Sequence, residues 1–203
     1  MEKKVIQEQR IRGYFIEATR EILKGEGLKS VNVRAIAERA GYSYATLYNY
    51  FKDIKELIFI CVQDFQLEAE TLIKEKTRMS PNGKEKIREI VKEYINYFTQ
   101  YPGIFELFFL EKMSSISGKQ PTAELIFTFL DRLTEEEWKY CIEQDIYSGQ
   151  EAAVRKQELR YMVTGLLLMY MNRMHPSSYE LFNEDVNSQL SFVLDKKWFK
   201  NLL

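Results

Sequence analysis

The segment from Asn32 to Phe51 constrains the fold most strongly, because it predicts two short helices joined by a tight turn. Asn32 can cap the first helix by accepting a hydrogen bond from a backbone amide one turn later. Gly41 permits the backbone to leave that helix, and Ser43 is placed to cap the second one. The apolar residues of the first helix share one face at helical spacing: Ile36, Ala37 and Ala40.

The second helix is predicted at about residues 44–50, with Leu47 and Phe51 facing the core. Its other side chains stay available at the surface: Tyr44, Ala45, Thr46, Tyr48, Asn49 and Tyr50. This pattern is typical of a helix-turn-helix, in which the first helix lies across the DNA backbone. The second helix enters the major groove and offers polar and aromatic side chains to it. The alternative is an ordinary helical hairpin in which the tyrosines only pack. The small core residues, the glycine turn and the polar outer face together favour DNA binding.

Four short elements follow one another in this region: Asn32-Val33-Arg34-Ala35-Ile36-Ala37, Ala40-Gly41-Tyr42-Ser43, Thr46-Leu47-Tyr48 and Tyr50-Phe51. With these elements, residues 11–58 resemble the DNA-binding domain of the TetR/AcrR family of bacterial transcription regulators. The rest of the chain is similar to that family only in length and helical character. Ile54 stands where members commonly carry a phosphate-binding lysine, so Lys52 or Lys55 would have to replace it. Tyr42 stands where a small aliphatic residue is usual.

The expected DNA contacts fall into two groups. Arg34 carries a long forked donor, which suits a bidentate contact with guanine. Residues of the second helix are candidates for contacts with base edges or thymine methyl groups: Tyr44, Thr46 and Asn49, with Ala45 beside them. Other residues are expected to hold phosphates and so to fix the register without reading sequence: Asn32, Ser43, Tyr48, Tyr50, Lys52 and Lys55.

The charge of the chain is divided unevenly. The whole chain of 203 residues has a formal charge of −1, which by itself does not suggest nucleic acid. Residues 1–60 hold 11 Lys/Arg and 8 Asp/Glu, a balance of +3, whereas residues 61–203 hold 18 and 22, a balance of −4. The positive charge therefore lies on the side of the motif, as phosphate binding requires. Taken alone, this split is equally explained by a chance scatter of surface charge.

Two cysteines, Cys61 and Cys141, lie in helical apolar patterns and have neither metal-ligand spacing nor a disulfide framework. They are expected to be buried thiols in a reducing, cytoplasmic compartment. The first residues do not form a signal peptide, and the apolar stretches near 104–110 and 166–171 are too short to span a bilayer. We expect no metal, no cofactor and no membrane partner.

Prolines are absent before Pro81 and strand-like alternation is rare, so the chain is predicted to be all-α with about nine helices. A first helix ends at Gly25-Glu26-Gly27, and a fourth begins at about Asp53 and runs to the region of Lys74. Later helices are predicted at about 84–101, 103–113, 122–147, 151–174 and 184–195. We expect a helix-turn-helix DNA-binding domain at residues 1–52 and a helical effector-binding and dimerisation domain at residues 53–203.

The second domain is rich in aromatic side chains. A packed aromatic core is the simpler interpretation. However, buried tyrosine hydroxyls need partners, and aromatic faces with a few hydroxyls are typical of small-molecule sites. The resemblance also implies an effector pocket, for which we expect a flat or apolar ligand of little charge. The candidate ligand-binding residues are Tyr94, Tyr97, Phe98, Tyr101, Phe105, Phe108, Phe109, Trp138, Tyr161, Met162 and Met169.

The segment 159–174 is apolar on nearly every face, so it needs cover on every side. A second apolar stripe follows at residues 186–194. The resemblance implies dimerisation through the last two long helices. The expected dimerisation residues are Leu159, Val163, Leu166, Leu167, Tyr170, Val186, Leu190, Val193 and Leu194.

These features predict a homodimeric, ligand-responsive transcription regulator, a repressor that reads a pseudo-palindromic operator. An enzyme is disfavoured, because the chain has one histidine and no nucleophile–base pair, metal set or cofactor loop. The second alternative is an interaction protein with the same fold that binds another regulator instead of DNA or ligand. The exposed tyrosines and Arg34 of the motif argue against it.

Overall fold

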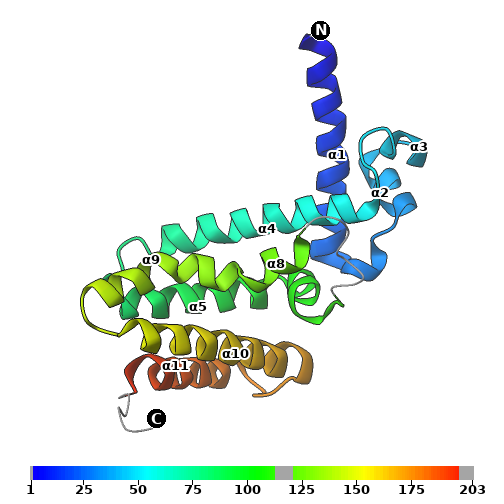
Figure 1. Cartoon of the computed structure of the whole chain (residues 1–203). Coiled ribbons are helices and arrows are strands. Elements are labelled where there is room, and N and C mark those ends of the chain that lie inside the picture. Colours follow the sequence, from blue (N-terminus) through cyan, green and yellow to red (C-terminus); the bar gives the residue numbers. More distant parts are fainter. Residues whose placement is uncertain (1, 113–120, 197–203) are drawn as a thin grey trace. The chain divides into compact units, whose positions relative to one another are not determined.

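The computed structural model describes residues 2–112 and 121–196, and every regular element in this part of the chain is helical (Figure 1). The all-α prediction is therefore confirmed. The chain divides into two compact units, one formed by residues 1–68 and 101–127 and the other by residues 69–100 and 128–203. Helix α4, Ile54–Lys76, begins in the first unit and ends in the second. The expected division into a DNA-binding domain at residues 1–52 and an effector-binding and dimerisation domain at residues 53–203 is a division by function, and it stays a prediction.

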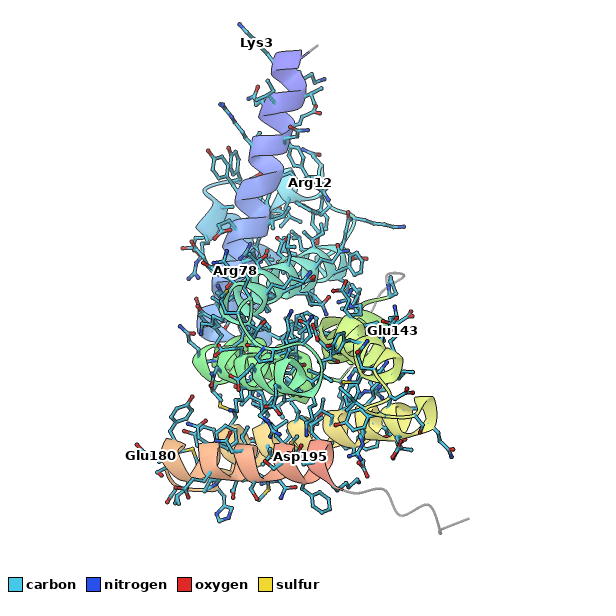
Figure 2. The ribbon with its side chains drawn as sticks, turned by 90° about the vertical axis from the view of Figure 1, so that its left-hand side faces the viewer. Lys3, Arg12, Arg78, Glu143, Glu180 and Asp195 are labelled. Carbon is cyan, nitrogen blue, oxygen red and sulfur yellow. The ribbon has the colours of Figure 1, made fainter. Side chains whose placement is uncertain are left out.

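The first unit is built around the long helix α1, Glu2–Glu26. Figure 2 shows Lys3 at the free end of this helix and Arg12 further along it. The other elements of the unit are η1 (Leu28–Ser30), α2 (Val33–Ala40), α3 (Tyr44–Leu47), α6 (Pro102–Phe105), the π-helical turn η2 (Glu106–Leu110) and α8 (Thr122–Phe127). Helix α1 packs against α2 and α6, and α2 packs against α3.

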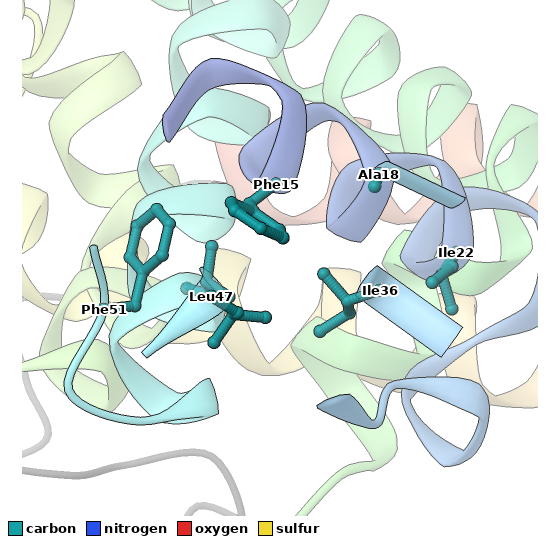
Figure 3. Close-up of a cluster of buried hydrophobic side chains, with 7 residues drawn as sticks. Phe15, Ala18, Ile22, Ile36, Leu47 and Phe51 are labelled. Atoms are coloured by element: carbon teal, nitrogen blue, oxygen red, sulfur yellow. The ribbon is translucent and has the colours of Figure 1, made fainter. Parts of the chain in front are cut away.

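A small apolar core holds the motif of the first unit together (Figure 3). Its side chains are fully or almost fully buried: Phe15, Ala18, Ile22, Ile36, Leu47, Phe51 and Leu57. The α1 members recur at helical spacing and so form one face, and each large side chain buried there contributes about 1.5–3 kcal/mol. Since Leu47 anchors α3 to this core, the opposite side of α3 is turned to solvent.

The second unit contains four long helices together with the end of α4. These are α5 (Lys84–Gln100), α9 (Phe129–Glu143), α10 (Gly149–Arg173) and α11 (Tyr179–Asp195). Helix α5 packs on α9, α10 and α11, and α10 and α11 run side by side (Figure 1). One apolar stripe of α10 and one of α11 are buried in this packing: Leu159, Val163 and Leu167, and Val186, Leu190 and Val193.

Two buried charged side chains of the second unit form hydrogen bonds with backbone groups. Glu137 accepts a hydrogen bond from the Gly83 N–H at 2.7 Å and forms an ion pair with Lys86 at 3.2 Å. Arg155 donates to the carbonyls of Val193 and Lys196. It therefore satisfies carbonyl groups at the C-terminal end of α11, where no intrahelical donor remains.

Helix boundaries differ from the predictions where local hydrogen bonds decide them. The helix expected at 122–147 is divided at Thr128 into α8 and α9, so the described residues hold ten α-helices rather than about nine. The last helix begins at Tyr179 rather than near residue 184, because the Ser178 side chain accepts a hydrogen bond from the Leu181 N–H.

The helix expected at 103–113 consists of α6 followed by the π-helical turn η2, which ends at Leu110; residue 113 lies outside the described residues. Helix α10 begins at Gly149, two residues earlier than expected. Ser148 and Glu151 form a reciprocal capping box there, which satisfies two backbone donors at the helix start.

Candidate nucleic-acid interface

The turn between α2 and α3 has the predicted construction. The Asn32 side chain accepts a hydrogen bond from the Ala35 N–H at 3.0 Å, and Ser43 accepts from the Thr46 N–H at 3.1 Å. Gly41 ends α2 in the left-handed region, at φ 75°, where a residue with a Cβ is strained. The two caps and the glycine turn are confirmed, and together they fix the direction in which α3 leaves the turn.

Helix α3 is shorter than predicted. Regular α-helix covers Tyr44–Leu47, and the chain continues to Phe51 in a tighter turn. In this turn the Asn49 N–H donates to the Thr46 carbonyl and the Tyr50 N–H to the Leu47 carbonyl, a three-residue spacing typical of a 3₁₀ turn.

The outer face of α3 and the turn after it is exposed. Tyr44 and Tyr48 are 63% and 54% exposed, and Ala45 and Asn49 are exposed beside them. Thr46 and Tyr50 are half-buried. This surface presents phenol hydroxyls and an amide to solvent, groups that can donate to and accept from DNA.

Arg34 projects from the exposed side of α2 and forms no ion pair with the other described residues. Arg39, on the same helix, is bound to Glu26 at 2.7 Å. The guanidinium of Arg34 is therefore available to an external acceptor, whereas that of Arg39 is already partly neutralised.

Arg12 of α1 ties the end of the motif to its own helix. It donates to the Tyr50 carbonyl at 2.9 Å and its guanidinium carbon lies 4.3 Å from the centre of the Phe51 ring. It also approaches Glu56 of α4 at 3.6 Å. Arg12 was not predicted as part of the motif, because nothing in its spacing along α1 distinguishes it from a surface arginine.

Two side chains, those of Asp53 and Glu56, bond backbone amides at the start of α4. Asp53 accepts from the Glu56 N–H, and Glu56 accepts from the Lys52 N–H, both at 2.9 Å. The side chain of Lys52 is exposed, whereas Lys55 and Ile54 are half-buried. This geometry favours Lys52 as the replacement for the lysine that the family pattern places at Ile54.

A second set of charges joins α1 to α4 within the first unit. Arg20 contacts Asp64 at 3.7 Å and Glu68 at 2.7 Å, and Lys24 contacts Glu68 at 2.8 Å. Burial raises the pKa of Asp64, with Glu17 and Glu68 adding to the shift, although Arg20 opposes it. This network braces the two helices.

Comparison with known proteins agrees with this geometry. Residues 15–59 match the profile of the bacterial regulatory proteins of the tetR family, and the match covers α2, α3 and the start of α4. These residues therefore resemble the DNA-binding domain of that family. The matched family consists of transcription regulators rather than enzymes, so the match supports a regulator that binds DNA.

Solved structures share the fold of this chain over nearly its whole length. The transcriptional regulator FadR from Bacillus subtilis, solved in complex with stearoyl-CoA, has 17% identity and a TM-score of 0.70, covering 92% of this chain and 100% of that one. FadR from Bacillus halodurans has 15% identity and a TM-score of 0.69, with 90% and 93% covered. RolR in complex with resorcinol has 13% identity and a TM-score of 0.64, with 93% and 88% covered.

The residues expected to bind a ligand divide between the two units. In the second unit, Tyr94, Tyr97 and Phe98 are buried on α5, with the rings of Tyr94 and Phe98 4.8 Å apart. Phe129, which was not among the predicted ligand residues, lies 5.6 Å from Tyr94. Trp138 is buried too, but its indole N–H already donates to Thr134.

In the first unit, Phe105 and Phe108 are buried, and Tyr101 and Phe109 are half-buried. The rings of Phe105 and Phe109 are stacked with centroids 5.4 Å apart. Phe109 lies in the π-helical turn η2. A π-helical turn is uncommon and often marks a functional segment.

Three of the expected ligand residues lie on α10: Tyr161, Met162 and Met169. Met162 is half-buried, but Tyr161 and Met169 are 61% and 47% exposed. Because the side chains of Tyr161 and Met169 face solvent, their positions do not fit the ligand-binding role expected for them.

The expected dimerisation residues are mostly covered by their own chain. Seven of them are buried in the packing of the second unit: Leu159, Val163, Leu167, Val186, Leu190, Val193 and Leu194. Leu166 and Tyr170 are half-buried. A side chain that is fully buried within the protomer offers no surface to a partner. The apolar stripes seen in the sequence therefore form part of the core of the second unit.

Two further observations concern the described residues only. No three His, Cys, Asp or Glu side chains among them come together as a metal site. None of the described helices is both long and apolar enough to cross a membrane.

Proposed function

We propose that this chain is a ligand-responsive repressor that acts in the cytoplasm as a homodimer on a pseudo-palindromic operator. The observation that carries the proposal is the outer face of α3. It is exposed and polar, while Leu47 on its other side is fully buried in the motif core. A helix held in this way offers a fixed pattern of donors and acceptors to the edges of bases.

Arg34, Tyr44 and Asn49 are the proposed base-reading residues. Their side chains are exposed and bond to no other described residue, so a DNA contact displaces no contact within the protein. Tyr48 and Lys52 are proposed to hold phosphates, for the same reason. Ser43, Thr46 and Asn32 already bond within the motif, so their contribution to binding is the orientation of α3 and α2.

Selection from random duplex DNA tests this proposal. We expect the purified protein to enrich two related half-sites in inverted orientation. Substitution of Arg34 by Ala should cost about 1–3 kcal/mol of specific affinity and relax the preference at one base pair per half-site. Arg39→Ala removes the same charge from the same helix and should leave base preference unchanged. Failure to enrich any sequence would contradict the proposal.

The dimer is proposed to form on the outward faces of α10 and α11. Tyr161 and Met169 are exposed on the side of α10 opposite its buried stripe, and Leu181 and Phe192 are 48% and 62% exposed on α11. Large apolar side chains that share one face and lack cover are typical of an interface. Two such helices per chain would pair across a two-fold axis.

Sedimentation of the wild-type protein and two variants tests the dimer. Phe192→Glu should yield folded monomers with weak operator binding, because the charge falls on the outward face. Leu190→Glu should instead unfold the second unit, since Leu190 is fully buried. A Phe192→Glu variant that remains a dimer would exclude this surface.

The effector is proposed to be a small apolar or aromatic molecule that binds beside Tyr94 and Phe98. Burial raises the pKa of the Tyr94 hydroxyl, and Asp131 adds to the shift, so the group stays a neutral donor for a ligand. That relatives of this fold were solved with stearoyl-CoA and with resorcinol supports a sensor of such molecules. Mass spectrometry of an organic extract of the purified protein should identify a candidate. Adding that molecule back should release the operator, with a smaller effect on Tyr94→Phe.

A further inference from the structure

The first two turns of α1 extend beyond the motif core. Every side chain from Lys3 to Arg10 is exposed, whereas Phe15, Ala18 and Ile22 of the same helix are buried. Figure 2 shows Lys3 near the N-terminal end of α1. We call residues 3–10 the α1 arm. Since no described residue covers it, the arm does not serve the packing of the first unit.

One face of the α1 arm continues onto the motif. Lys3, Gln7, Arg10 and Tyr14 follow one another at steps of four, three and four residues, so they share a face of the helix. Tyr14 stacks on Tyr42, with ring centroids 6.1 Å apart. Tyr42 directly precedes Ser43, the cap of α3. The polar face of the arm therefore lies on the same side of α1 as the start of α3.

The charge on the α1 arm is not neutralised by the protein. Lys3, Lys4 and Arg10 oppose a single acid, Glu8, which leaves residues 3–10 with a charge of +2. None of these three cations forms an ion pair with a described residue.

Four of the seven other cations within residues 3–52 are paired with acids. These four are Arg12, Arg20, Lys24 and Arg39. Within residues 3–52, the cations without such a partner among the described residues are Lys3, Lys4, Arg10, Lys29, Arg34 and Lys52. Half of the available positive charge therefore lies on the arm, although the helix-turn-helix itself lies further along the chain.

We propose that the α1 arm is a second DNA-binding site, which holds the phosphate backbone beside the half-site read by α3. This inference rests on the proposed function, because it assumes that α3 faces DNA. From Lys3 to Tyr14 the helix rises about 16 Å, comparable to roughly five base pairs of duplex. Phosphates would neutralise the three close cations, which otherwise repel one another, and the release of counterions from the DNA would favour binding.

The test compares three proteins on two DNAs. The arm variant is Lys3→Gln/Lys4→Gln/Arg10→Gln, and the matched control is Lys74→Gln/Arg78→Gln/Lys139→Gln, which removes the same charge from exposed sites outside the motif. Glutamine is a good helix former, so both variants should fold with wild-type helicity by circular dichroism. The DNAs are the fragment enriched from random sequence and an unrelated duplex of equal length.

The expected result is a smaller salt dependence for the arm variant on both DNAs. The slope of log K against log salt should fall by about 0.9 for each phosphate that the variant no longer binds, up to ~2.7 per subunit. The footprint on the enriched fragment should shorten at its outer ends while base preference stays the same. The control should keep the wild-type slope and footprint.

An arm variant with the wild-type slope and footprint would overturn the proposal while leaving the regulator function intact. If the wild-type protein shows no base preference, the proposed function fails, and the slope on the unrelated duplex still decides the role of the arm. Binding of the wild-type protein to anionic vesicles but to neither DNA would also overturn the proposal.

Discussion

Gly103 lies where α6 meets the end of α1, and a single added methyl group should separate the two helices. A Cβ at this position would meet the backbone carbonyls of Leu23 and Lys24, the latter oxygen at 2.8 Å and the former closer still. Ordinary contact begins at 3.4 Å, and both neighbours are backbone atoms that cannot rotate away. Gly103→Ala therefore forces α6 to move relative to α1 within the first unit.

Two opposing effects set the magnitude. Alanine in a helix is favoured over glycine by about 0.5–1 kcal/mol. Overpacking of a close contact costs about 1–3 kcal/mol when the backbone must shift. A Cβ at position 103 would meet two backbone carbonyl oxygens, so we expect the cost of overpacking to exceed the gain in helix propensity. The variant should lose about 1–2 kcal/mol of unfolding free energy.

Urea denaturation followed by circular dichroism, at one fixed protein concentration, measures this loss. Gly13→Ala is the matched control, since Gly13 also lies in a helix of the first unit but a Cβ there would meet no atom within 4 Å. The control should be more stable than wild type by about 0.5–1 kcal/mol. A Gly103→Ala protein as stable as the control would refute the steric reasoning.

Arg12→Met should weaken specific operator binding more than binding to random DNA, because it frees the Tyr50 carbonyl without removing a phosphate contact; equal losses in a gel-shift series would contradict this. Asn32→Ala should lower the unfolding free energy by about 1 kcal/mol in urea titrations because the cap is removed, and an unchanged midpoint would show that the cap is dispensable. Burial raises the pKa of Cys141 from 9.0 to about 11, so the folded state keeps its proton while the unfolded state loses it. Stability should therefore be unaffected by this thiol below pH 9 and should fall between about pH 9 and 11, and Cys141→Ala should flatten that decline in urea midpoints measured against pH. Neither Cys61 nor Cys141 should react with a thiol reagent at pH 8 until urea is added, and rapid labelling of the native protein would count against their burial.

The motif was predictable because its signals are local. Asn32, Gly41 and Ser43 act on amides only a few residues away, so their roles follow from the order of residues alone. Leu47 could be assigned to the core for a similar reason, since helical spacing separates it from the polar residues around it.

The apolar stripes of the last two helices show the limit of this reasoning. The sequence shows that Leu167 and Leu190 need cover, but it does not say whether their own chain or a second one provides it. In the folded chain both are buried by the packing of α5, α10 and α11, and the exposed apolar residues are others, such as Phe192. Burial of a helix face depends on which helices lie next to it, and that is a property of the assembled unit.

Sequence alone determined the all-α class, the helix-turn-helix and its caps, because periodicity and capping act over a single helical turn. Tertiary structure decided which cations remain available to DNA. Arg12, Arg34 and Arg39 look alike along the chain, yet Arg12 and Arg39 are paired with acids while Arg34 is not. Their partners, Glu56 and Glu26, are brought close only when the helices pack, because an ion pair depends on distance in space rather than on separation in sequence.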